Sequence, residues 1–231
     1  MGMFTDPRVS LLQFADGLFP AGGYAHSFGL ETYVSEERIR DRAGLEAFLS
    51  SHLEGSAGPC DAVVVCAAVR LGQMQDRENA CALDAEMEAL RPASELREAS
   101  RQMGRQTLRV ATALLGSPLL DGFSADVESG QTPGHHAVVF GLAGGVLGWS
   151  ARDAAQGYLQ ASAATIVSAA LRLLPLGQLE GQRALWSMNE VVSRLAREAA
   201  EKDVRDLWSF TPGLEIASMR HVRLEARLFR S

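Results

Sequence analysis

Two neighbouring residues with catalytic side chains, His26 and Ser27, lie in a glycine-rich stretch at residues 20–31, PAGGYAHSFGLE. Their surroundings superficially resemble the G-x-S-x-G turn that presents the nucleophile of many hydrolases. That turn follows a buried strand, whereas Phe19 and Pro20 precede it here, and proline does not fit a central strand. We therefore favour a structural role, with Ser27 capping a helix and His26 fixing a turn. A small-molecule hydrolase that uses both residues remains the alternative.

A second candidate for chemistry is the adjacent pair His135–His136, because imidazole is a common ligand for nickel and zinc. Neighbouring residues on a helix point about 100° apart, so the two rings cannot easily share one ion. The zinc spacings C-x₂-C and H-x₃-H are absent from the sequence. We predict that His135 caps or packs at the start of a helix and that the chain has no metal site. If the chain were a free-standing nickel carrier, His135 and His136 would be its ligands.

The glycine-rich stretch must be positioned by a sharp turn and a helix. Gly22 and Gly23 can adopt backbone angles that other residues avoid, which favours a fixed turn. The helix is expected to begin after Ser27, with Glu31 near its positively charged end.

Further helices are predicted from apolar residues at helical spacing. We expect them at residues 9–14, 43–53, 62–69, 92–115, 137–148, 150–174, 181–202 and 211–224. The helix at 43–53 is expected to end before 62–69, because Gly55, Gly58 and Pro59 lie between the two. Residues 117–134 are predicted to be loop with room for one short helix. Four glycines in 137–148 indicate very close helix packing, and Ser150 is expected to cap the helix that follows.

The helix at 92–115 carries a basic ridge on one side. Its buried face is predicted from the spacing of Leu96, Ala99, Met103, Val110 and Leu114. The ridge consists of arginines four residues apart: Arg97, Arg101, Arg105 and Arg109. A solvated face is the ordinary interpretation, and a docking ridge for an acidic partner is the functional one. We expect that reversing two of these charges leaves thermal melting nearly unchanged.

The composition favours a protein that is soluble, cytoplasmic and all-α. The chain has 231 residues, is 47% hydrophobic and carries a net charge of −6, which argues against nucleic-acid binding by bulk electrostatics. Its three cysteines form no close pair, and the first residues show no targeting pattern. The apolar run at 137–149 is shorter than the ~20 residues of a membrane span. No nucleotide-binding motif occurs. We predict one domain, residues 1–231, of eight to ten helices, without a catalytic residue or a cofactor of its own.

The glycine-rich stretch also opens a series of motifs that resembles a known family. The others are Asp61–Ala62, Met103–Gly104, His135–His136 with Gly141, residues 172–178 (RLLPLGQ), Gly181–Gln182 and residues 227–231 (RLFRS). Their order is similar to that of UreF, the urease accessory protein family. Small departures are Ala21, where many members have isoleucine, and Tyr24, where many have phenylalanine.

This resemblance implies a non-enzymatic assembly factor. UreF proteins are all-helical homodimers that bind the accessory protein UreD, also called UreH. That complex recruits the GTPase UreG and delivers nickel to apo-urease. By this resemblance, nickel and GTP are handled by the assembled complex and not by this chain.

The resemblance also implies partner contacts near the two ends of the chain. We expect residues 1–19 and 218–231 to be mobile without a partner, and we expect the tail to become ordered on UreD with Arg227 beside Tyr24. Besides the arginine ridge, the expected partner-binding residues are Tyr24, His26, Ser27, Arg220, His221, Arg227, Leu228, Phe229, Arg230 and Ser231.

Overall fold

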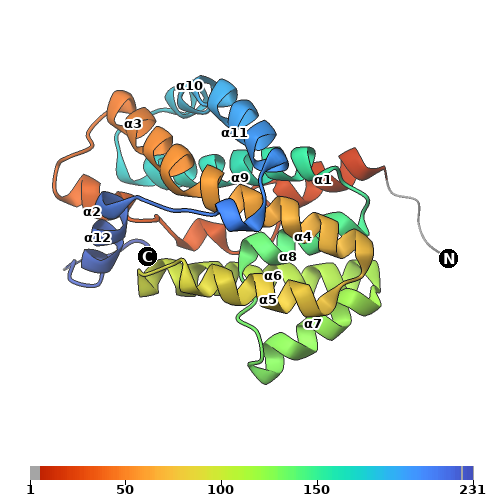
Figure 1. Ribbon diagram of the computed structural model, residues 1–231. Coiled ribbons are helices and arrows are strands. Elements are labelled where there is room, and N and C mark those ends of the chain that lie inside the picture. Colours follow the sequence, from red (N-terminus) through yellow and green to blue (C-terminus); the bar gives the residue numbers. More distant parts are fainter. Residues whose placement is uncertain (1–5, 225, 231) are drawn as a thin grey trace.

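The computed structural model describes residues 6–224 and 226–230, and every regular element among them is a helix (Figure 1). In chain order the elements are α1 (Pro7–Ala15), η1 (Gly23–Ala25), α2 (Leu30–Ser35), α3 (Arg42–His52), η2 (Leu53–Ala62), α4 (Val63–Met74), α5 (Arg77–Ala89), α6 (Ser94–Leu115), α7 (Pro118–Ser129), α8 (His136–Val146), α9 (Ala151–Leu173), α10 (Gln178–Ser187), α11 (Asn189–Glu201), η3 (Val204–Asp206) and α12 (Pro212–His221). The all-α prediction is confirmed, and the described α-helices outnumber the eight to ten expected.

Two hydrophobic clusters lie on either side of α4 and α9. One joins α3, α10 and α11 to α9, with Leu45, Leu159 and Leu195 among its buried residues. The other joins α1 and α5–α8 to α4, with Phe123 and Trp149 at its centre. Figure 1 shows the corresponding arrangement, with α3, α10 and α11 above α9 and α5–α7 below α8. No helix in the described part of the chain is long and apolar enough to cross a membrane.

The expected break before α4 is absent. α3 continues through η2, a stretch of π-helix, into α4, with right-handed helical angles at Leu53, Ala62 and Val63. Pro59 lies inside this stretch and has no N–H to donate to a regular helix. The wider π turn accommodates the missing hydrogen bond, so the helix continues with a bulge and does not end at Pro59.

Two other segment predictions were wrong. Residues 117–134 contain a full helix, α7, which has Pro118 at its first position and ends at Gly130 with φ +78°. The expected single helix at 181–202 is two helices, α10 and α11, which meet at Met188 (φ −88°, ψ −7°).

The glycines of α8 allow the close packing that the sequence predicted. A Cβ on Gly141 would lie 2.5 Å from the Cβ of Ala68, and one on Gly145 would overlap the carbonyl oxygen of Val69. Both neighbours belong to α4, which packs along α8. Because no side chain separates the two backbones, α8 sits in the middle of the molecule.

The buried face of α6 is rotated from the predicted one. Ala99 is buried as expected, but Leu114 is exposed, and the other buried positions are Ser100, Gly104, Thr107, Leu108 and Ala111. A Cβ on Gly104 would overlap the carbonyl oxygen of Gly134. Small and polar residues therefore form this face because α6 approaches the backbone that precedes α8.

Candidate functional site

The glycine-rich stretch forms two left-handed turns. Gly22 (φ +85°) precedes η1, and Gly29 (φ +87°) precedes α2. A Cβ on Gly29 would lie 3.0 Å from the carbonyl oxygen of Leu214 in α12. The expected cap is corrected in part: Gly29 is the N-cap, while the Ser27 hydroxyl accepts the N–H of Glu31 at 3.4 Å.

Glu31 is the residue that joins the two ends of the chain. Its buried carboxylate accepts hydrogen bonds from His221 Nε2 at 2.6 Å and from the backbone N–H groups of Leu228 at 2.6 Å and Phe229 at 3.2 Å. A buried carboxylate is costly unless such donors surround it. The sequence indicated a role for Glu31 at the helix end and missed this one, which depends on residues almost 200 positions away.

The tail is anchored to the body of the chain. The N–H of Arg230 donates to the carbonyl oxygen of Ala25 at 2.8 Å. Phe229 is buried, and the guanidinium of Arg172 lies 4.3 Å from its ring centre while donating to the carbonyl oxygen of Tyr24 at 2.8 Å. In the chain alone Arg172 thus lies beside Tyr24, and the contact of Arg227 with Tyr24 on UreD stays a prediction. Described residues 226–230 thus pack on this same chain, and ordering of the tail by UreD stays a prediction.

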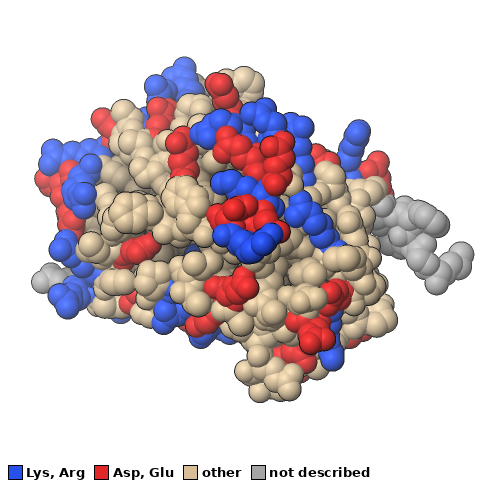
Figure 2. All heavy atoms as spheres, viewed as in Figure 1, with Lys and Arg blue, Asp and Glu red and all other residues tan. Residues whose placement is uncertain are grey.

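An exposed apolar surface lies beside these anchors. Ile216, Met219, Val222 and Leu228 are 42–53% exposed. Arginines accompany them on α12 and the tail: Arg220, Arg223 and Arg227 are all exposed. We call this set the α12–tail surface. Figure 2 shows basic side chains, with acids among them, at the left edge where α2 and α12 lie in Figure 1.

The other expected contact residues divide into exposed and buried ones. Tyr24 and Arg230 are exposed, whereas His26, Ser27 and His221 are buried. The buried residues can act on a partner through the turns they hold. Ser231 lies outside the described residues.

The arginine ridge of α6 is partly neutralised. Glu88 of α5 pairs with both Arg97, at 3.4 Å, and Arg101. Arg105 pairs with Glu98 at 2.9 Å. Arg109, the last of the row, is exposed. Among the described residues, Arg109 is therefore the ridge arginine without a carboxylate in ion-pair contact.

Glu88 also reaches the first histidine of the pair. His135 precedes α8, as predicted, with Nε2 2.9 Å from Glu88 Oε2 and Nδ1 3.0 Å from the hydroxyl of Ser100. Its own backbone N–H donates to buried Asp84 at 2.8 Å. His136 instead lies against the rings of Phe140 and Tyr158. The two imidazoles face different surroundings, and among the described residues no three His, Cys, Asp or Glu side chains are placed to hold a metal ion.

Two serines with a histidine nearby, Ser27 and Ser100, lack the setting of a nucleophile. Ser27 is fully buried and His26 is 3% exposed, so a substrate cannot reach them in this conformation. The contacts of Ser100, His135 and Glu88 resemble a catalytic triad. Ser100 lies in the interior of α6, however, where backbone N–H groups are used by the helix and cannot form an oxyanion hole.

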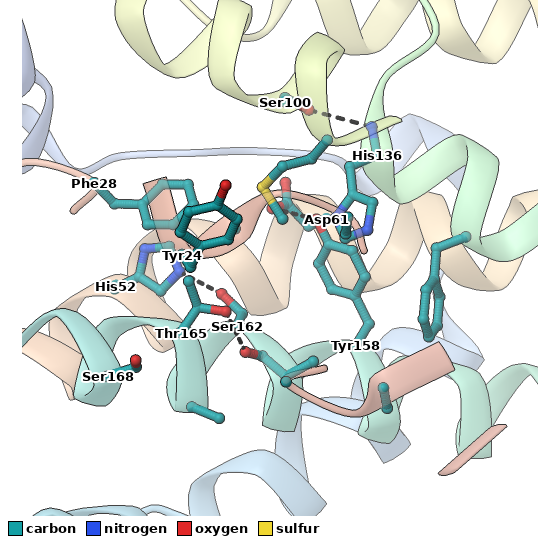
Figure 3. A pocket seen from close by; sticks show the side chains of 18 of the residues that line it. Tyr24, Phe28, His52, Asp61, Ser100, His136, Tyr158, Ser162, Thr165 and Ser168 are labelled. Carbon is teal, nitrogen blue, oxygen red and sulfur yellow. Dashed lines mark hydrogen bonds between the residues drawn. The ribbon is translucent and has the colours of Figure 1, made fainter. Parts of the chain in front are cut away.

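A cavity of about 160 Å³ lies between η2, α6, α8 and α9, and the glycine-rich stretch with exposed Tyr24 also lines it (Figure 3). On its wall Asp61 accepts from Arg91 at 2.5 Å and from the Tyr158 hydroxyl at 3.4 Å. Burial lowers the pKa values of His52 and His136, which also line the cavity, to about 4. A carboxylate within the apolar run at 57–69 was the sequence signal for this cluster, but its arginine partner could not be inferred.

Comparison with known proteins identifies the family. The UreF family model matches residues 39–189. Proteins named urease accessory protein UreF are similar along nearly the whole chain. The one from Bacillus sp. (strain TB-90) is 31% identical over 96% of this chain and 98% of its own length. The one from Paenarthrobacter aurescens (strain TC1) is 32% identical over 97% and 98%, and the one from Corynebacterium glutamicum (strain R) is 31% identical over 99% and 100%. The chain therefore belongs to the UreF family of urease accessory proteins, which are maturation factors and not catalytic enzymes.

Proposed function

We propose that this chain is an assembly platform for urease maturation in the cytoplasm. As a homodimer it binds UreD (UreH), recruits and modulates the GTPase UreG, and so supports nickel insertion into apo-urease. The chain contributes surfaces to this process, while nickel and GTP are handled by the assembled complex. The family relationship supports the general role.

The α12–tail surface is the observation that carries the proposal. Ile216 and Met219 lie one turn apart on α12, and Leu228 extends the apolar area onto the tail. Apolar residues with arginines around them are typical of the energetically important part of an interface. We assign this surface to UreD.

The anchoring of this surface supports the same assignment. Thr32 Oγ1 donates to the carbonyl oxygen of Ala217 at 2.9 Å, which ties α12 to α2. Glu31 holds the tail beside it. A surface that is ordered before binding loses less conformational entropy in the complex.

The test is co-purification with UreD and UreG, with and without GTP. Ile216→Glu places a charge in the middle of the α12–tail surface and is expected to weaken UreD binding by about tenfold or more, because an unpaired charge must be buried in the complex. Met74→Glu is the matched control, since Met74 is also an exposed apolar residue of a helix but lies on α4. Circular dichroism checks that both variants are folded. Equal UreD binding by the two variants would contradict the assignment.

A further inference from the structure

A second, open cavity lies between the glycine-rich stretch and α6. Its volume is about 480 Å³. Its walls carry three arginines from two distant parts of the chain, namely Arg105 and Arg109 of α6 and Arg230 of the tail. Gln102 and Gln106 of α6 also line it. We call this cavity the arginine groove.

The arginine groove has an excess of positive charge in a chain whose net charge is −6. Glu98 pairs with Arg105 at 2.9 Å. Within residues 6–224 and 226–230, no carboxylate is in ion-pair contact with Arg109 or Arg230. Burial, and next the nearby charge of Arg230, lower the pKa of His26 to about 4. The groove therefore selects an anionic occupant.

The glutamines indicate which kind of anion fits. A glutamine side chain both donates and accepts hydrogen bonds, as a peptide group does. A phosphate group offers mainly acceptors, so the glutamine carbonyl oxygens would face further oxygens. The side chains of Gln102 and Gln106 are one helical turn apart, as are those of Arg105 and Arg109. Glutamines and arginines thus alternate along this wall of the groove. This arrangement suits an extended peptide that presents both its backbone and its carboxylates.

We propose that the arginine groove binds an acidic peptide segment of a protein partner, and that the docked tail completes this site. The proposal extends the platform function and rests on it for the identity of the partner. It places the acidic contact in the groove and not along the whole ridge, because Arg97 and Arg101 already share Glu88 and Arg101 also lies 3.9 Å from Glu98. Arg230 supplies the second wall, and Glu31 helps to hold it there through Leu228 and Phe229, together with the bond from the Arg230 N–H to Ala25. Glu31 is thus a positioning residue for a site that it does not touch.

The direct test measures binding of fluorescein-labelled hexaglutamate to the full chain by fluorescence anisotropy. We expect binding that weakens as salt is added, because exposed charges are screened. Arg109→Glu should weaken it by about tenfold or more, since a repulsive contact replaces an attractive one. Arg152→Glu is the matched control: it makes the same charge change at an exposed position of α9 and should leave the affinity within about twofold. Equal effects of the two variants would overturn the proposal.

The role of the tail is tested with Glu31→Gln and its control Glu36→Gln. Glu36 follows α2, and its contact with Arg220 is a 3.5 Å ion pair at the surface. Glu31→Gln should weaken hexaglutamate binding and also increase hydrogen exchange at Leu228 and Phe229, whereas Glu36→Gln should do neither. If Glu31→Gln speeds hydrogen exchange at Leu228 and Phe229 but leaves hexaglutamate binding unchanged, the proposal that the docked tail completes the site is contradicted.

Competition separates a peptide site from a simple anion site. Hexaglutamine should not bind, and inorganic phosphate at matched ionic strength should compete no better than chloride. Displacement by phosphate at low concentration would overturn the proposal in favour of a small-oxyanion site. None of these assays contains UreD or UreG, so their failure is distinguishable from failure of the platform function, which co-purification measures.

Discussion

Buried polar residues in this protein are held by partners that lie far away in the sequence. Asp61 pairs with Arg91, and Glu31 meets His221 and the tail. The sequence placed Asp61 in a motif shared with a known family and Glu31 early in a helix. It could not show the partners, because side-chain pairing across a fold depends on how helices cross. Candidate residues were therefore predictable, while their contacts were not.

We predict that the folded protein loses stability in mild acid because of His52 and His136, which line the 160 Å³ cavity. The pKa values of His52 and His136 are lowered to about 4 chiefly by burial, against an unfolded value near 6.5. Between about pH 4 and pH 6.5 the unfolded state therefore binds more protons than the folded state. The free energy of unfolding falls as the pH decreases through this range. The loss is at most about 3 kcal/mol for each histidine.

The measurement is the melting temperature at pH 7 and pH 5 for the wild type and for His52→Gln. Glutamine cannot be protonated in this range and can still contact Ser162, whose hydroxyl lies 3.0 Å from His52 Nε2. The variant should lose less stability on acidification than the wild type. An identical loss in both proteins would show that His52 is not responsible.

Most helices were predictable from the sequence, although α5 was not predicted and α7 lies where we expected mainly loop. Helix faces and junctions were less predictable. Ser150 caps α9 by accepting the N–H of Asp153 at 3.1 Å, as expected. The face of α6 was assigned from its largest apolar residues, but close packing on the backbone before α8 selects the smallest ones. Pro59 predicted the end of a helix, yet a π turn accommodates this residue and the helix continues. In each case a tertiary contact overrides the local preference.

The packing of α4 on α8 predicts that Gly145→Ala destabilises the protein by about 1–3 kcal/mol, because the new methyl group overlaps backbone atoms that cannot move independently. Gly17→Ala is the control, since nothing lies within 4 Å of a Cβ at that position. Chemical denaturation measures both. A Gly145→Ala variant as stable as the control would show that the two helices can separate at little cost.

At the scale of the whole molecule, we predict a homodimer. Family likeness suggests two-fold pairing, and the described surface includes large apolar residues away from the α12–tail surface, such as Trp186 and Leu179 of α10. Sedimentation equilibrium at micromolar concentration should give twice the mass of the chain. A monomeric mass both with and without UreD would contradict the prediction.

The contact between Glu31 and Leu228 spans 197 positions of the chain, and this separation has a consequence for folding. Contacts between distant residues form slowly, since the intervening chain must first become compact. The polypeptide therefore builds most of its helices before the stretch at 20–31 reaches its final neighbours. Until then the Glu31 carboxylate is hydrated and the arginine groove has one wall.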